Sequence, residues 1–274
     1  MRDLFLEFIY PDGKVERPSD DFTFHLLDVD VSPAQTVNQT MTINGTDGEL
    51  TFFNTYAPYT LEMSCFIESI DTTEQDFFET ELRQKIHTRG PFYVRHGRMP
   101  NIKYAVNKVD YAKEESGRNY LKFKLIFNVF KGYSESHRTT VDYLNSDSDQ
   151  WQFGTNLLSD ELPVYIHTKN SFKIYNASSV AITPIMRHSL DIALTCVGNP
   201  KVKNLTTGDV FIYNKMLNKK DVLLISGVYP FLNNNNCGRD TNHGIITLAP
   251  GWNEFFIEEA ESINIAFSFS FIFR

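Results

Sequence analysis

The sequence contains no run of the roughly 20 apolar residues that a membrane-spanning helix needs. Its first residues, MRDLFLEFIYPDG, also lack the apolar stretch and the cleavage site of a secretory signal peptide. We therefore expect a protein that is made in a cytosol-like compartment and has no membrane anchor.

Cysteine is scarce, and histidine never occurs at a metal-binding spacing. Cys65, Cys196 and Cys237 are odd in number and far apart, which favours neither a disulfide framework nor a zinc site. None of the 7 histidines is placed like the pair in His-Glu-x-x-His, where two ligands share one helix face. The sequence predicts no bound metal and no cofactor.

Signals of catalysis are equally sparse. The segment CGRDTNHG, from Cys237 to Gly244, brings together a thiol, an acid and an imidazole, but no helix start accompanies it to activate the thiol. The carboxylate pairs Glu114-Glu115 and Glu258-Glu259 fall in predicted turns, where charges solvate a loop. We predict that the protein is not an enzyme, and a Cys237/His243 hydrolase stays as a third alternative.

Positive charge is in deficit, because 34 acidic residues outnumber 26 Lys and Arg residues and leave a formal charge of -8. This balance disfavours a basic surface that wraps nucleic acid. It is compatible with an acidic channel wall, which repels DNA instead of binding it.

Aromatic residues, by contrast, are abundant, with 23 Phe in 274 residues. Near the end of the chain apolar side chains occupy every second position, which is the pattern of a half-buried strand; they are Ile263, Ile265, Phe267, Phe269, Phe271 and Phe273. Upstream, Pro250-Gly251 predicts a tight turn between two short strands. We expect the terminal strand to be a hydrophobic edge that another sheet or subunit covers.

The first 130 residues read as strands with one helix. The turn pairs Asn44-Gly45 and Asp47-Gly48 predict a hairpin or bulged loop within residues 36–54. For the helix, Thr72 and Gln75 have the spacing of a capping box, and Gly90-Pro91 provides a stop. Its apolar face consists of Phe78, Leu82 and Ile86.

A polar segment rich in Ser, Thr, Asn and Asp separates two regions. We predict a β domain with one α-helix over residues 1–135, a linker over 136–160, and a C-terminal β-sandwich over 161–274. Short strands at intervals of about ten residues in the last region are typical of a sandwich or jelly roll. The predicted fold class is mainly β.

The order of several segments resembles the distal tail proteins of siphophages, which are tail-tip hubs in phages of Gram-positive bacteria. The segments are TINGTDGELTF, HTRGPFYVRH, KYAVNKVDY, LTTGDVFIYN, GVYPFLNNNN and TNHGIITLAPGWNEFFI, and together they span most of the chain. The resemblance implies a hexameric ring with a tail-tube-like N-terminal domain and a galectin-like C-terminal sandwich. It also implies a virion structural protein of the tail tip, made in the cytoplasm of the bacterial host.

Partners follow from the same resemblance. They are further copies of the chain, the tail tube protein, a tail-associated or tail-fibre protein and a receptor-binding protein, with DNA only in transit through a central channel. In a ring, two different surfaces of the N-terminal domain must meet. Our candidates for the oligomer interface are Asn44, Gly45, Asp47 and Gly48 in the predicted turn, and Arg98 in a later loop.

Two functions therefore stand side by side. The first is a structural hub that joins the tail tube to baseplate, tail-fibre and receptor-binding components and takes part in host attachment. The alternative is a carbohydrate-binding β-sandwich that attaches to the host cell wall, for which Trp151 and Trp252 offer stacking surfaces. The sugar site of galectins, His-x-Asn-x-Arg, is not present at His188, which Ser189 and Leu190 follow.

Overall fold

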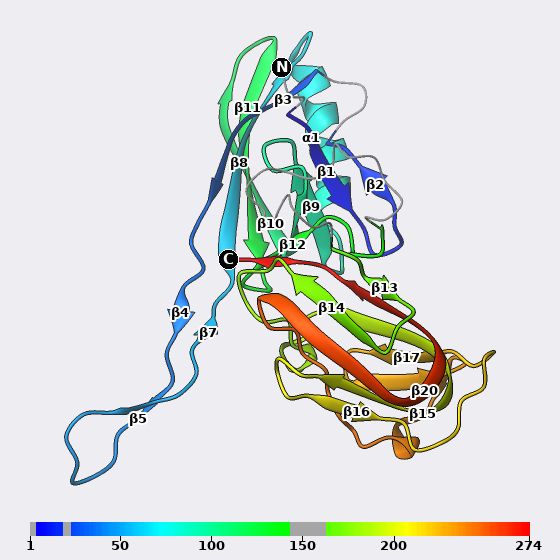
Figure 1. Ribbon diagram of the computed structural model, residues 1–274. Helices are drawn as coiled ribbons and strands as arrows, with labels where there is room; N and C mark the ends of the chain where they lie inside the picture. The colour runs from blue at the N-terminus through cyan, green and yellow to red at the C-terminus, as the bar shows by residue number, and fades with distance from the viewer. Residues whose placement is uncertain (1–3, 19–22, 143–162) are drawn as a thin grey trace. The chain divides into compact units, whose positions relative to one another are not determined.

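The computed structural model describes residues 4–18, 23–142 and 163–274. Most of the predicted linker, 136–160, and Trp151 lie outside these residues. The chain divides into two compact units, one formed by residues 1–137 with Arg274 and the other by residues 138–273. Figure 1 shows the elements of each unit, and each unit is described by itself.

The first unit contains one long antiparallel sheet, one helix and a ribbon of short strands. The strands are β1 (Leu6–Ile9), β2 (Val15–Glu16), β3 (Phe24–Val31), β4 (Thr36–Val37), β5 (Thr40–Met41), β6 (Leu50–Thr51), β7 (Thr55–Tyr56), β8 (Tyr59–Glu68), β9 (Phe92–His96), β10 (Ile102–Ser116), β11 (Tyr120–Val129) and β12 (Ser134–Ser136), and the helix is α1 (Thr72–Ile86). In the main sheet the strand order is β2-β1-β9-β10-β11-β8-β3, and β12 pairs with β10.

Strict alternation along β8 and β11 forms the core of this sheet. In β8 every second residue from Tyr59 to Ile67 is buried, and β11 alternates in the same way from Leu121 to Val129. The register places Phe123 opposite Cys65 and Leu125 opposite Met63. Because side chains on a strand point to opposite faces in turn, this pattern leaves one face apolar and the other polar.

Helix α1 covers the apolar face, but its capping differs from the sequence prediction. The N-cap is Asp71, one residue earlier than Thr72, and its side chain accepts a hydrogen bond from the Glu74 backbone N–H at 2.9 Å. The Glu74 carboxylate in turn accepts from the backbone N–H of Ile70. The capping box is therefore Asp71 with Glu74, and the helix ends at Ile86 rather than beside Gly90-Pro91.

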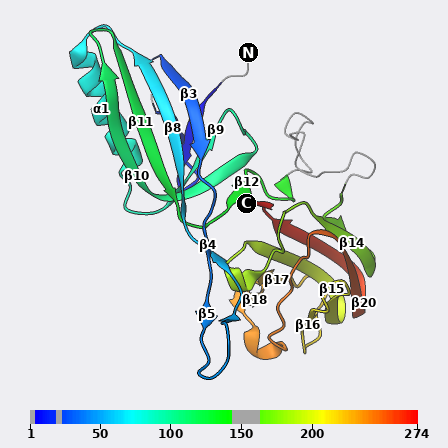
Figure 2. The same cartoon turned by 90° about the vertical axis from the view of Figure 1, so that its left-hand side faces the viewer.

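Gln75, which the sequence suggested as a capping residue, fastens the helix to the sheet instead. Its side chain is buried, and its Nε2 donates to the carbonyl oxygens of Gly117 at 2.8 Å and Tyr120 at 3.1 Å, at the turn between β10 and β11. Further along, Phe78 packs on Phe123 with ring centroids 5.5 Å apart. Figure 2 shows α1 running alongside β10 and β11.

The second unit is built on an 8-stranded antiparallel sheet. Its elements are β13 (Ile166–His167), β14 (Ser171–Asn176), η3 (Pro184–Met186), β15 (Leu190–Asn204), β16 (Val210–Ile212), β17 (Leu223–Ser226), β18 (Tyr229–Leu232), β19 (Asn235–Asn236), η4 (Gly238–Asp240), β20 (Gly251–Phe269) and β21 (Ile272–Phe273). The strand order is β13-β20-β15-β17-β18-β19, with β14 also on β20 and β16 also on β15.

The predicted hairpin at Pro250-Gly251 and the predicted edge strand are both wrong. Residues 251–269 form one 19-residue strand, β20, which pairs with β15 on one side and with β13 and β14 on the other. Asn253, expected in a turn, is fully buried, and its side chain bonds to both the backbone N–H and the carbonyl of Ala249. Phe267 and Phe269 are thus at the centre of a sheet, whereas Phe271 lies beyond the end of β20.

Strand β20 bends back on itself halfway along. The rings of Phe255 and Phe267 have centroids 4.9 Å apart, whereas a straight strand separates residues twelve positions apart by about 40 Å. The bend coincides with positive φ angles at Glu259 and Ser262 and with register shifts against β15. Opposite it, Gly198 has a φ of 128°, and a Cβ there would lie 2.3 Å from the Glu259 carbonyl oxygen.

The predicted fold class is confirmed as mainly β with one α-helix among the described residues. The two facing layers of the second unit come from a single bent sheet, and a specifically galectin-like topology stays a prediction. At the start of the predicted linker, Thr140 is fully buried, and its hydroxyl donates to the Phe267 carbonyl at 2.7 Å. Residues directly after His137 therefore belong to the packing of the second unit.

Candidate assembly surface

The most exposed part of the first unit is the ribbon from β4 to β7, which we call the arm (residues 36–56). Two short ladders hold it together, Thr36 opposite Tyr56 and Met41 opposite Leu50. Every residue of the arm is exposed. Figure 1 shows the arm leaving the main sheet between the end of β3 and the start of β8.

The predicted interface residues Asn44, Gly45, Asp47 and Gly48 lie at the tip of the arm. Gly45 and Gly48 have φ angles of 88° and 82°, which are conformations that glycine adopts without strain. Between them the hydroxyl of Thr46 donates to the Ile43 carbonyl at 3.0 Å and closes the turn. The turn pairs in the sequence therefore mark the tip of a real hairpin.

Apolar side chains are unusually frequent on this exposed ribbon. Phe53 is 93% exposed and Phe52 is 53% exposed. Further exposed apolar residues of the arm are Val37, Met41, Ile43, Leu50 and Tyr56. Contiguous exposed apolar surface on a soluble protein marks a site that another surface covers. Sequence analysis predicted the hairpin but did not identify these residues as a contact surface.

Arg98, the fifth predicted interface residue, is not part of the arm. It follows β9, where its Nη1 pairs with the Asp28 carboxylate at 2.7 Å and its Nη2 donates to the Leu27 carbonyl at 3.2 Å. Both charged side chains are substantially exposed. Arg98 therefore ties the loop after β9 to strand β3, and no described contact brings it together with the turn at Asn44–Gly48.

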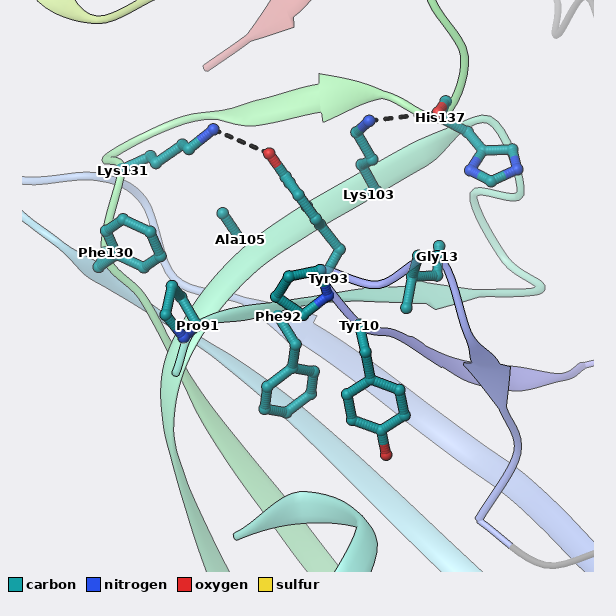
Figure 3. Close-up of a pocket in the computed structure, with 12 residues that line it drawn as sticks. Tyr10, Gly13, Pro91, Phe92, Tyr93, Lys103, Ala105, Phe130, Lys131 and His137 are labelled. Atoms are coloured by element: carbon teal, nitrogen blue, oxygen red, sulfur yellow. Dashed lines mark hydrogen bonds between the residues drawn. The ribbon is translucent and has the colours of Figure 1, made fainter. Parts of the chain in front are cut away.

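A pocket that the sequence analysis missed lies on the polar face of the sheet. Its floor is a cross-strand row in which Ile9 of β1 is opposite Tyr93 of β9, and Tyr93 is opposite Ala105 of β10. The cavity volume is about 410 Å³, and Tyr10, Pro11, Pro91, Phe92 and Phe130 contribute further apolar lining. Figure 3 shows the side chains of Tyr93, Lys103 and Lys131 extending to one side of the sheet, whereas the rings of Tyr10 and Phe92 extend to the other.

Two lysines form the polar rim of this pocket. Lys131 Nζ donates to the Tyr93 hydroxyl at 2.9 Å and pairs with Glu135 at 2.8 Å. The amine of Lys103 donates to the His137 carbonyl at 3.3 Å (Figure 3). Both amines also lie over the Tyr93 ring, at 4.7 Å for Lys103 and 5.2 Å for Lys131. Burial, and then the Glu135 carboxylate, raise the pKa of Tyr93, so the phenol stays protonated.

The geometry around Cys237 does not favour the hydrolase alternative. Cys237 is buried, and burial, followed by the charge of Asp240, raises the pKa of its thiol above the ordinary value. A catalytic thiol needs the opposite shift, because the thiolate is the nucleophile. Within residues 4–18, 23–142 and 163–274, no three His, Cys, Asp or Glu side chains are grouped so that they could hold a metal ion. In the same residues no helix has the length and apolarity to cross a membrane.

The second unit has a shallow hollow of its own beside η3. It has a volume of about 620 Å³ and is lined by Arg187, Asp191 and the exposed Tyr229, among others. His188 is buried there, and its Nδ1 accepts a hydrogen bond from the Thr183 backbone N–H at 3.1 Å. Trp252 is half-buried against Tyr175, with ring centroids 5.0 Å apart.

Comparisons with known proteins agree with the resemblance seen in the sequence. Residues 19–129 match the model of the phage tail protein RIFT-related domain, a segment that includes the arm and α1. No curated protein matches the sequence significantly.

Among solved structures, the fold is similar to that of SPP1 Dit, described as a paradigm of the hub adsorption apparatus in phages that infect Gram-positive bacteria. That match has a TM-score of 0.69 and 13% identity, and it covers 98% of this chain and 100% of SPP1 Dit. A chain of the phage P2 baseplate in its activated conformation with Ca has a TM-score of 0.46 at 12% identity, with 98% and 97% of the two chains covered. The likeness to SPP1 Dit establishes a common fold over nearly the whole chain.

Proposed function

We propose that this chain, whose residues 19–129 carry a phage tail protein RIFT-related domain, is the structural hub of a siphophage tail tip. In this proposal six copies form a ring that joins the tail tube to baseplate, tail-fibre and receptor-binding components. The ring surrounds a channel through which DNA passes, and the protein acts in the virion and not as an enzyme. The fold shared with SPP1 Dit supports this function.

The exposed apolar arm is the observation that carries the proposal. A two-stranded ribbon alone in water is marginally stable at best, because it has no third strand or helix to cover it. Here the ribbon also exposes Phe52, Phe53 and Leu50 and leaves its strand edges unpaired within the unit. Contact with a neighbouring subunit would bury the apolar side chains and provide partners for the unpaired strand edges. We therefore assign the arm, with the predicted residues Asn44 to Gly48 at its tip, to the subunit interface.

A closed ring also constrains which surfaces meet. Each subunit of a cyclic hexamer uses two different patches, one for each neighbour. The arm provides one patch, and the polar face of the sheet is available for the other. The Arg98–Asp28 pair stays a candidate for the rim of this contact because both side chains are partly exposed.

The net charge of -8 suits a channel that conducts DNA without holding it. DNA is repelled by an acidic wall, so it makes no persistent contacts that slow its passage. The second unit is then free for attachment of receptor-binding or tail-fibre proteins.

The hollow beside η3 supports the second candidate function, a carbohydrate-binding module that attaches to the cell wall. It combines the exposed ring of Tyr229 with the charged side chains of Arg187 and Asp191. An aromatic face together with a few polar groups is a composition that sugar sites use.

Static light scattering followed by negative-stain microscopy tests the hub. The expected result is a six-fold ring, formed by the protein alone or after mixing with the tail tube protein. The double change Met41→Ser and Leu50→Ser should abolish the ring and leave circular dichroism unchanged. Phe77→Ser, on a still more exposed position of α1, is the control and should leave the ring intact. A monomer under all these conditions that binds wall polysaccharide would reject the hub in favour of the carbohydrate module.

A further inference from the structure

We propose that Phe53 on the arm of one copy inserts into the pocket formed by Ile9, Tyr93, Ala105 and Phe130 of a second copy. This inference rests on the proposed ring, because it names the two surfaces that meet between neighbouring subunits. It assigns the pocket a protein side chain as its ligand, with the two lysines of the rim facing the acidic arm.

The pocket has the properties of a site for an aromatic side chain. Its lining is mainly apolar, while its volume of about 410 Å³ exceeds that of one phenyl ring and falls in the range of small-ligand pockets. Tyr93 is held in place by the hydrogen bond from Lys131 and by pairing with Ile9 and Ala105. A pocket whose lining is already ordered loses little entropy when it is filled.

Phe53 is the arm residue with the most to gain from burial. Its side chain is 93% exposed, more than that of any other large apolar residue among the described residues. In the pocket it would approach the amines of Lys103 and Lys131, which already lie over one aromatic ring. A second ring at this position adds a further cation–π contact.

The charges of the two surfaces are complementary. From Ser32 to Tyr59 the only charged residues are Asp47 and Glu49, so the arm is purely acidic. The pocket lining carries two ammonium groups, Lys103 and Lys131, and Lys131 is paired with the buried carboxylate of Glu135. Opposite charges at the edge of an interface speed association and set its register.

The strand register places arm and pocket at the same end of the sheet. Tyr93 is opposite Ala105, Val106 is opposite Val129, and Val129 is opposite Tyr59 at the base of the arm. The pocket lies on β1, β9 and β10, whereas the arm leaves from β3 and β8 at one end of the strand order. Copies placed side by side thus bring the arm of one to the pocket of the next, which is a head-to-tail contact.

Phe53 is poorly placed to fill the pocket of its own chain. Along an extended strand Phe53 lies about 20 Å beyond Tyr59. The ladders Thr36–Tyr56 and Met41–Leu50 keep the arm extended away from the sheet (Figure 2). Reaching the pocket of the same chain requires the ribbon to fold back over the sheet.

Photo-crosslinking tests the contact directly in the full-length protein. Phe53 is replaced by benzoylphenylalanine, equal amounts of 14N- and 15N-labelled chains are mixed, and crosslinked peptides are identified by mass spectrometry. We expect mixed-isotope products that join position 53 to residues 91–105 or 130–137. The same substitution at Phe77 is the control and should give no product with these residues.

The outcomes separate this inference from the hub. Three crosslinking results would overturn the Phe53 contact if microscopy still shows a ring: mixed-isotope crosslinks to other residues, only same-isotope products, or no products. In each case the hub would stay intact. Absence of any ring, alone or with the tail tube protein, would overturn both.

A binding measurement adds a quantitative test. Phe53→Ala should weaken the apparent association constant at least about tenfold in sedimentation velocity, as truncation of an interface anchor does. Phe77→Ala should leave the constant unchanged. Lys103→Glu should weaken association, and the second change Glu49→Lys should restore part of the loss. If Phe53→Ala associates like the parent protein, the pocket is not its site.

Discussion

The arm and the β15–β20 pair are both antiparallel ribbons, and their surroundings differ. Within the arm Met41 and Leu50 are opposite each other and both are 50% exposed. In the second unit Ile192 and Phe267 are also opposite each other, and both are almost completely buried. Pairing of apolar residues across a ladder is therefore the same in the two regions. Only the β15–β20 ladder has further strands and a second layer within its own unit.

This difference indicates what each ribbon does for the protein. The β15–β20 pair stabilises a unit, because its side chains lose contact with water when the chain folds. Side chains of the arm lose contact with water only when a second surface arrives. Apolar residues of the β15–β20 pair should therefore govern unfolding, and apolar residues of the arm should govern association.

The largest expected effect sharpens this contrast. Phe267→Ala removes a fully buried ring that packs on Phe255 and Phe172, and it should lower the free energy of unfolding by about 3–5 kcal/mol. Phe53→Ala, at a concentration where the protein is monomeric, should change it by less than about 0.5 kcal/mol. Urea unfolding measures both. Equal effects of the two changes would show that the arm packs within its own chain.

A second prediction concerns pH. His96 in the first unit is 1% exposed, is stacked on Tyr104, and has no hydrogen-bond partner for either ring nitrogen among the described residues. Burial, and then the charge of Arg98, lower its pKa from 6.5 to about 4. The unfolded chain therefore takes up this proton at a higher pH than the folded protein does. Stability from this group is full above pH 6.5 and is lost as the pH falls towards 4.

The loss should amount to on the order of 3 kcal/mol, because each pKa unit corresponds to about 1.4 kcal/mol. Urea unfolding of the parent protein and of His96→Leu is measured at pH values from 7.5 to 4. Because the carboxylates titrate in both proteins, the difference between them isolates the contribution of His96. The difference in stability between the two proteins should shift in favour of the variant as the pH falls. Parallel curves would contradict the assignment to His96.

A smaller effect is expected at the helix that covers the first sheet. Asp71→Ala removes the N-cap hydrogen bond to Glu74 and should cost about 1 kcal/mol in the free energy of unfolding. Thr72→Ala, at the position that the sequence had suggested, should cost less. Both are read from the urea midpoint at a constant slope. A larger loss of unfolding free energy for Thr72→Ala than for Asp71→Ala would instead support the capping box of Thr72 and Gln75 that the sequence predicted.

The smallest effect is expected at Arg98. Its ion pair with Asp28 is exposed to solvent, so Arg98→Glu should change the stability of the monomer by less than about 1 kcal/mol. Its effect on ring formation decides whether it belongs to the interface beside the arm. Light scattering that shows an intact oligomer would remove Arg98 from the interface.

Local patterns in the sequence predicted many of the elements. Alternation identified the strands at Leu61–Ile67 and Leu121–Val129, and the glycine turns identified the arm. The capping box was misplaced by one residue because Thr72 and Asp71 are both good N-cap residues, and in the structure Asp71 occupies the N-cap position. The hairpin at Pro250-Gly251 was wrong because the residues before it form no ladder with β20, although the chain bends at Pro250 and Gly251 has a φ of 84°.

The pocket could not be predicted from the sequence, because no local sequence pattern indicates which strands lie side by side. Tyr93 alternates with the buried Phe92 and Val94, which places it on the outer face of β9. That it meets Ile9, Ala105 and the two lysines depends on strand order. These residues come from four separate parts of the chain.

By itself, then, the sequence determined the mainly β class, the single helix and the hairpin of the arm. Each depends on spacing between near neighbours along the chain, and two- or 3.6-residue periods are visible without any long-range contact. Tertiary structure decided that the aromatic strand ending at Phe269 is central and bent, that Phe53 stays exposed, and that a pocket forms beneath Lys103 and Lys131. Those outcomes depend on which strands pair across long separations, and pairing is settled by the total surface that the whole chain can bury.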